Sequence, residues 1–413
     1  MTNRAKSPDT FCHRRRVFAA ALALAALPPT VSAQGVPAPL HDGEVTLDAT
    51  TSAQVPKRTG RARFFDPDDG QLDLSHFLED ARGFLPVPIV VTEPAVGYGG
   101  GAAGMFLRPR KEAGNEGWAR PDISVGGGLV TQNGTWAAFA GDSSRFLDGR
   151  LRTLVGGGAG QINLDFFGLS DDPSSRDQGV RYSLQFAAFV GQANWQLAPK
   201  SPWSVGVRYV YANVDPRLRD EPLFPGLAER TRVTVSAPTV IVEFDSRDNI
   251  FTPTRGVYAE TAYLASREAL GATVGFERFD QLLIGWYPLR DDVTLAANAT
   301  YSRASEGTPF FLRPFVTLRG VPAVRYQGDQ AASIEIEARW QFYGRWSVVA
   351  FGGAGRTWTE RENRSSQQNV GSGGAGFRYE LASKFGLHAG IDVAASPGTV
   401  AVYFVIGNAW FRP

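Results

Sequence analysis

Residues 333–342 alternate without a break between apolar and polar side chains, and this pattern strongly limits the possible fold. Ile334, Ile336 and Trp340 fall on one face of an extended strand, and Glu335 and Glu337 fall on the other. A sheet in water would turn its charged face outward. A transmembrane barrel would turn its apolar face outward to lipid and its charged face inward to a polar lumen. Other segments have to distinguish these two architectures.

The first 33 residues have the three parts of a secretory signal peptide. A basic segment ends at Arg16, an apolar run covers residues 17–27, and the small residues of Val31-Ser32-Ala33 provide a cleavage site. The apolar run is shorter than the roughly 20 residues that a membrane helix needs. We therefore expect residues 1–33 to be removed after export. Cys12, the only cysteine of the chain, would be lost with them.

The charge balance argues against a nucleic-acid partner. The chain has 42 Lys and Arg side chains and 41 Asp and Glu side chains, for a formal net charge of +1. Proteins that bind nucleic acid usually carry a strongly basic patch. We expect no nucleic acid among the partners of this chain.

Two short regions follow the signal peptide. Residues 34–71 show no periodicity, and we interpret them as a flexible linker. The acidic stretch from Asp66 to Gly70 fits a tight turn better than a calcium loop, whose terminal glutamate is missing. In residues 72–85, Leu74, Phe77 and Leu78 repeat at helical spacing. This spacing predicts a short amphipathic helix, either near the barrel lumen or mouth or at the membrane interface.

Residues 86–413 read as short alternating segments separated by turns. Segments of about ten residues with apolar side chains outward are typical of transmembrane barrels. We expect outward faces on two further segments, where the apolar members are Val180, Tyr182, Leu184 and Phe186 in one, and Trp203, Val205, Val207, Tyr209 and Tyr211 in the other. A change of phase around Pro238 suggests a bulge. The predicted fold is all-β: an antiparallel transmembrane barrel of 16 strands, with 14 as the alternative. A soluble β-sandwich is the less favoured architecture.

Three motifs in this region resemble the BamA/TamA-type barrels of the bacterial surface antigen superfamily. The first is a D-x-R-D-x-x-x-x-P-x-x-G turn, matched by Asp245, Arg247, Asp248, Pro253 and Gly256. The second is Leu318-Arg319-Gly320, which is similar to the core of the family's sixth extracellular loop. The third is a carboxyl-terminal strand that ends in the aromatic Phe411, like an outer-membrane insertion signal. Five strands are expected after the loop motif, as in the family.

The resemblance implies that Arg319 reaches into the lumen and pairs with an acid on each of the next two strands. Glu337 matches the first acid. Gly353 occupies the place of the second, so another acid such as Glu335 would have to complete the anchor. The polypeptide-transport-associated domains of the assembly members have no room between residues 34 and 86. The chain therefore resembles the short members of the superfamily.

The resemblance implies a role in inserting or translocating protein or lipid at the bacterial outer membrane. A passive pore or structural barrel is the alternative, and an outer-membrane hydrolase is less favoured. We expect no enzyme activity, because His388 and Asp392, the best acid–base pair, would lie about 13 Å apart along one strand. We also expect no cofactor or metal, because metal-ligand spacing and phosphate-binding loops are missing. Asp245, Arg247 and Asp248 fit an ion-paired turn better than a catalytic site. Expected partners are outer-membrane lipid and the barrel-assembly machinery, with the chain as a monomer and its client unknown.

Overall fold

The computed structural model describes residues 60, 64–67, 69–75, 77, 83–108, 122–166, 180–218, 232–361 and 364–410. Sixteen strands make up nearly all of its regular structure: β1 (Gly83–Val91), β2 (Gly99–Arg108), β3 (Asp122–Thr131), β4 (Trp136–Phe146), β5 (Leu151–Phe166), β6 (Val180–Gln196), β7 (Trp203–Leu218), β8 (Val233–Asp245), β9 (Gly256–Ser266), β10 (Phe276–Arg290), β11 (Val293–Ala304), β12 (Gln330–Tyr343), β13 (Trp346–Arg361), β14 (Arg364–Ala382), β15 (Leu387–Ser396) and β16 (Thr399–Ile406). Three 3-10 turns, η3 (Glu268–Leu270), η4 (Phe310–Leu312) and η5 (Ser383–Phe385), lie between strands.

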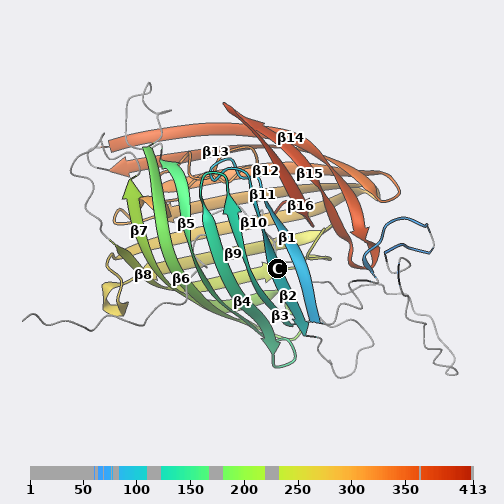
Figure 1. The fold of residues 1–413 in the computed structure, drawn as a ribbon, viewed down its shortest axis with the longest axis horizontal. Helices are drawn as coiled ribbons and strands as arrows, with labels where there is room; N and C mark the ends of the chain where they lie inside the picture. Colours follow the sequence, from blue (N-terminus) through green and yellow to red (C-terminus); the bar gives the residue numbers. More distant parts are fainter. Residues whose placement is uncertain are drawn as a thin grey trace, which may run out of the picture.

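The strands form one antiparallel sheet that curls into a nearly closed barrel (Figure 1). Each strand pairs with the next in the chain, and the strand order runs from β1 to β16. Between the described strands β1 and β16 the sheet has no ladder, and we call this gap the seam. The prediction of a 16-stranded barrel is confirmed. Within the described part of the chain, no helix is long and apolar enough to cross a membrane.

The two ends of the barrel differ. One end carries the start of β1, the end of β16 and tight connections such as Asp291–Asp292 and Gly344–Arg345, and we call it the turn end. The other carries residues 92–98 between β1 and β2 and the long connection 305–329 between β11 and β12, and we call it the loop end.

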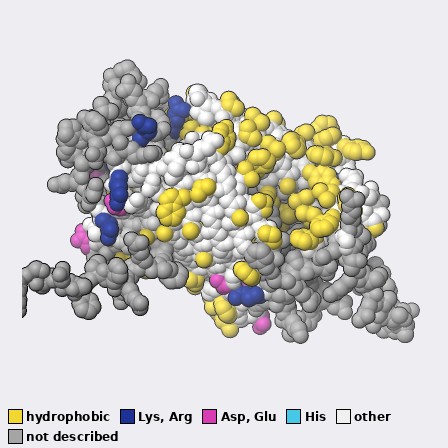
Figure 2. Space-filling view, viewed as in Figure 1, with side chains coloured by type: hydrophobic (Ala, Val, Ile, Leu, Met, Phe, Trp, Pro, Cys, Tyr) yellow, Lys and Arg dark blue, Asp and Glu magenta, His cyan; other side chains and the backbone are white. Residues whose placement is uncertain are grey.

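The outer surface is apolar, as the alternation predicts for β12 and β7. Ile336 is 54% exposed on the outside of β12, whereas Glu335 beside it is 2% exposed on the inside. Trp203, Val207 and Tyr211 are likewise exposed on β7. On the face shown in Figure 2, charged side chains lie toward the two ends, and the surface between them consists of apolar side chains, uncharged side chains of other types and backbone.

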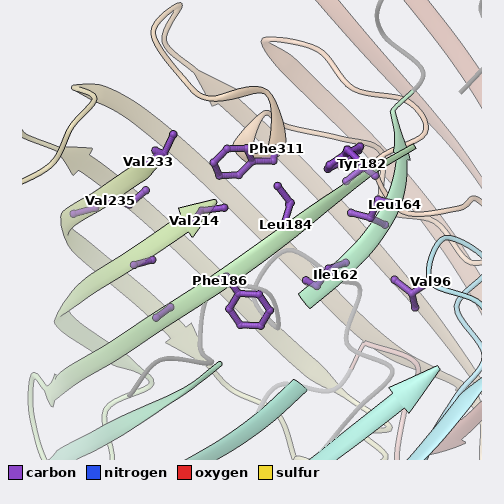
Figure 3. Packing of buried hydrophobic residues seen from close by; sticks show 14 of the residues in the cluster. Val96, Ile162, Leu164, Tyr182, Leu184, Phe186, Val214, Val233, Val235 and Phe311 are labelled. Carbon is purple, nitrogen blue, oxygen red and sulfur yellow. The ribbon is translucent and has the colours of Figure 1, made fainter. Parts of the chain in front are cut away.

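The expectation for the start of β6 is wrong. Tyr182, Leu184 and Phe186 are buried inside the barrel, where Tyr182 packs edge-on against the ring of Phe310 at 5.2 Å. They join inward residues of β5, β7 and β8 in an apolar cluster at the loop end, which we call the loop-end cluster (Figure 3). The alternate residues, which point outward, are polar there, since Gln185 bonds to Gln161 on β5 and Arg181 is exposed. This end of the barrel therefore has the usual polarity of a protein in water: apolar inside and polar outside.

The same inversion explains the apparent change of phase in β8, where the predicted bulge is absent. The ladder between β7 and β8 runs in continuous register from Trp203↔Phe244 to Val214↔Val233. Val235 points inward and Val240 points outward because they are five residues apart on a regular strand. The environment changes along the strand while the backbone stays regular.

Several sequence predictions fall outside the described residues. They are the signal peptide at 1–33, most of the linker at 34–71, residues 76 and 78–82 of the helix predicted at 72–85, and Phe411. Strand β1 begins at Gly83, three residues before the predicted start of the barrel and within the segment assigned to the helix. Residues 64–67 and 69–71 of the linker contact the barrel through Asp66 and Asp69.

Candidate functional site

The connection between β11 and β12 turns back into the lumen and carries Arg319 to the barrel wall. The guanidinium group of Arg319 lies 2.8 Å from Glu335 and 2.8 Å from Glu337, both on β12. The backbone N–H of Arg319 also donates to Glu335. Strand alternation turns both glutamates inward, so a single strand presents two carboxylates to one arginine.

A third carboxylate completes this cluster, and sequence reasoning missed it. Asp392 on β15 accepts a hydrogen bond of 2.8 Å from Nη1 of Arg319 and two bonds, 2.5 and 2.9 Å long, from Arg378 on β14. Its side chain is fully buried. The available signal was that Asp392 is the only acid in β15. Two arginines and three carboxylates thus make up what we call the lumen anchor: Arg319, Arg378, Glu335, Glu337 and Asp392.

Aromatic rings enclose the arginine of the lumen anchor. The guanidinium carbon of Arg319 lies 3.5 Å from the ring centre of Phe351 and 5.5 Å from that of Trp410. The indole N–H of Trp410 donates to Glu335 at 2.9 Å. Buried charges are costly unless they are paired and hydrogen-bonded, and here the ion pairs, the indole and the rings share that role.

Glycine is required at two places beside Arg319. Gly320 has φ +86°, donates its N–H to the Tyr403 hydroxyl at 2.9 Å and accepts from Ser396 at 2.7 Å. At Gly353, a Cβ atom would lie 2.7 Å from the side chain of Leu318 and 2.7 Å from the carbonyl oxygen of Ile334 on β12. The position where the family carries its second acid is therefore filled by the loop itself, and the acid comes from β15 instead.

The tip of the loop reaches both edges of the sheet. Arg325 donates to Thr399 on β16 at 3.2 Å, while the N–H of Ala323 donates to Glu93, just after β1, at 3.1 Å. Glu93 is 3% exposed, and burial raises the pKa of its carboxyl group against the opposing effect of bonds from Ala323 and Ala95. The loop therefore bridges the seam at the loop end.

The D-x-R-D turn joins β8 and β9 at the turn end. Asp245 forms an ion pair of 2.7 Å with Arg247, whose guanidinium carbon lies 4.6 Å from the ring centre of Tyr258. Asp248 accepts bonds from the backbone N–H groups of Thr254 and Arg255. These bonds close the turn on itself, as expected for an ion-paired turn.

The rest of that turn packs into the barrel. Gly256 has φ +104°, and a Cβ there would lie 2.4 Å from the Ser246 carbonyl oxygen. The carbonyl oxygen of Pro253 accepts a bond of 3.3 Å from Arg339 on β12. Phe251 is 2% exposed and belongs to an apolar cluster with Ile250, Met105, Ala382, Phe385 and Leu387. This cluster, which we call the turn-end cluster, joins β2 to the β14–β15 turn.

Residues 64–77 before β1 also bind the turn end, and we call their described part the strap. Arg345, between β12 and β13, bonds to Asp66, Asp69 and Asp73 at 2.6, 2.7 and 2.6 Å. Burial opposes the charge on Asp73, but bonds from Ser383, Ser75 and Arg345 hold its pKa well below the usual range. Leu74 and Phe77 pack on the turn-end cluster. The acidic turn thus binds an arginine, and the linker is fixed at this point.

His388 and Asp392, the acid–base pair considered from the sequence, each contact other groups. The carboxylate of Asp392 accepts hydrogen bonds from Arg319 and Arg378. The Nδ1 atom of His388 lies 3.3 Å from the carbonyl oxygen of Gly386. Within the described ranges no three His, Cys, Asp or Glu side chains form a group that could hold a metal ion. The arrangement is suited to holding a loop in place.

Structural comparison shows the same fold in three solved barrels. BamA from Haemophilus ducreyi lacking POTRA domains 1–3 aligns with TM-score 0.52 and 10% identity over 78% of this chain and 68% of its own. CdiB from Escherichia coli aligns with TM-score 0.57 and 12% identity over 78% and 61% of the two chains. CdiB from Acinetobacter baumannii gives 0.53 and 11% over 78% and 59%.

The chain thus spans about three fifths of the length of the two CdiB structures. At these identities the likeness is one of fold. No protein-family model matches the chain, and no curated protein matches it.

Proposed function

We propose that this chain is an outer-membrane barrel that inserts or translocates protein or lipid, with the β11–β12 loop as its internal latch. The observation that carries the proposal is the set of contacts made by residues 319–325. They bind β12 and β15 through Arg319, β16 through Arg325 and the segment after β1 through Ala323. A loop that binds both edges of an unpaired seam controls whether those edges can separate.

A passive pore is the competing function, and the packing inside the barrel disfavours it. The loop-end cluster contains Phe311 and Val324 from the loop together with Leu184 and Val235 from the wall. The strap and the turn-end cluster occupy the other end. Ions would have to cross an apolar region and pass a buried loop, so we expect the resting barrel to conduct poorly.

The proposal also covers the orientation of the barrel in the outer membrane and its insertion there. The apolar outer surface suits lipid, and short turns typically face the periplasm in barrels of this kind. The turn end would then be periplasmic and the loop end extracellular. We propose that the barrel-assembly machinery inserts the chain as a monomer and reads Phe411 at its carboxyl end.

The function is tested in cells that lack the protein, by comparing the protein and lipid composition of their outer membrane with that of complemented cells. The proposal predicts loss of a surface protein or a lipid class, restored by the wild-type chain. An unchanged composition would overturn it. Planar-bilayer recordings test the alternative, because a large and stable current from the wild-type protein would favour a passive pore.

A further inference from the structure

The seam edge of β1 contains two prolines, and their orientation follows from the ladder to β2. Pro86 pairs with Gly104 and Pro88 pairs with Ala102 in an uninterrupted antiparallel register. In such a ladder, the N–H and C=O of one residue point to the same neighbouring strand, and successive residues alternate. Residues 86 and 88 therefore share a direction, opposite to that of residue 89.

The direction of Ile89 is fixed by its contact with β2. A Cβ atom built on Gly100 of β2 would lie 3.4 Å from the Ile89 carbonyl oxygen, so this oxygen points toward β2. The backbone groups of Pro86 and Pro88 consequently point to the seam. Proline has no N–H, so this edge offers two carbonyl oxygens and no donor over its central part.

We propose that Pro86 and Pro88 keep β1 and β16 unpaired at the seam and prevent β1 from acting as the template for an incoming strand. A strand placed against this edge, whether β16 or part of a client, would leave two of its own carbonyl oxygens without donors. In the hydrocarbon region no water replaces those donors, so the pairing is strongly disfavoured. Prolines at strand edges block pairing in soluble proteins for the same reason.

The two prolines explain why the sheet ends at β1 and β16. They also limit how a substrate can pair with the barrel, and this second conclusion rests on the proposed function. β16 has no proline between Thr399 and Ile406, so its free edge keeps a full set of donors. A client that pairs with this barrel would pair with β16. A substrate that passes along β1 would form no backbone hydrogen bonds with β1.

The test is amide hydrogen exchange of the detergent-solubilised full chain, resolved along β16. In the wild type, the amides of β16 that face the seam should exchange freely, while those that face β15 are protected. In a Pro86→Val, Pro88→Val double variant, two donors return. The seam-facing β16 amides should then exchange at least about tenfold more slowly, because the new ladder protects them.

Pro238→Val is the matched control, since Pro238 lies on β8 away from the seam and pairs with Tyr209. It should leave β16 exchange unchanged. If the seam-facing β16 amides are already protected in the wild-type protein, the inference is wrong. Unchanged exchange in a folded double variant would also overturn it, because another element would then hold the seam apart.

Complementation of cells lacking the protein separates this inference from the proposed function. A double variant with a paired seam that fails to restore outer-membrane composition supports both. A double variant with a paired seam that restores composition fully supports the proline inference and overturns the seam as the route of transport.

Discussion

Arg319 and Asp392 are 73 residues apart in the sequence, yet their side chains meet at 2.8 Å in the lumen. Their contact ties the β11–β12 loop to β15, near the last strand, and it is supported by Glu335 and Glu337 on β12. The pair makes the lumen anchor a link between distant parts of the barrel wall.

Replacing Arg319 should therefore be costly. Arg319→Ala leaves three carboxylates facing one remaining arginine, and loss of one partner from a buried ion pair typically costs about 3–5 kcal/mol. We expect a lower denaturation midpoint in detergent and loss of heat-modifiable migration on gels. Arg290→Ala is the control, because Arg290 and Asp292 form an exposed pair whose loss should cost less than about 1 kcal/mol. Equal effects of the two variants would argue against the anchor.

Replacing Asp392 should lower the stability of the barrel more than replacing Glu337. Asp392 accepts bonds from both Arg319 and Arg378, whereas Glu337 contributes a contact to Arg319 alone among the ion pairs of the described residues. We expect Asp392→Asn to lower the free energy of unfolding more than Glu337→Gln, measured by guanidinium titration in one detergent. The reverse order would mean that the arginine depends mainly on β12.

The two adjacent glycines on β13 should respond differently to alanine. A Cβ at Gly353 would lie 2.7 Å from the Ile334 carbonyl oxygen on β12 and 2.7 Å from the Leu318 side chain of the loop, whereas a Cβ at Gly352 would meet its nearest atom at 3.7 Å. Gly353→Ala should destabilise the barrel by about 1–3 kcal/mol through overpacking, and Gly352→Ala should stay within about 0.5 kcal/mol. Similar unfolding curves for both variants would contradict the close packing around Gly353.

The strap should stay bound in mild acid. Because the folded-state pKa of Asp73 is held below its ordinary value, its contribution to stability is present above about pH 4. That contribution is lost only as the pH falls through the lowered folded-state pKa. Limited proteolysis of the strap should be unchanged from pH 7 to pH 5 and should increase only in stronger acid. Arg345→Ala should expose the strap at pH 7, and continued protection in that variant would contradict the contact.

The strand count and the outward faces of β7 and β12 could be predicted because alternation is a local property. Ile336 lies between Glu335 and Glu337, and Trp203 is followed by Ser204; these polar neighbours point inward. The start of β6 could not be predicted in this way. Tyr182 and Leu184 follow the same alternation, but they lie at the loop end, where the inside is apolar and the outside is polar. The depth of a residue along the barrel is set by the whole sheet.

The lumen anchor was predictable in part for a similar reason. Glu335 and Glu337 could be identified as candidate partners of Arg319 because they share the inward face of the next strand. Asp392 could not, because its position depends on how far the loop crosses the lumen. Two local signs were available: Asp392 is the only acid in β15, and the lack of a side chain at Gly353 leaves room for Leu318.

The lumen anchor also has a consequence for how the barrel folds. Arg319 can gain Glu335 and Glu337 when β12 is in place, but Asp392 becomes available only after β15 has joined the sheet. Until then, Arg319 and its loop lack one of their three acidic partners. Such long-range contacts form late and slowly compared with hairpins. The contact with Asp392 thus fixes the loop inside the barrel only after nearly all of the strands have joined the sheet.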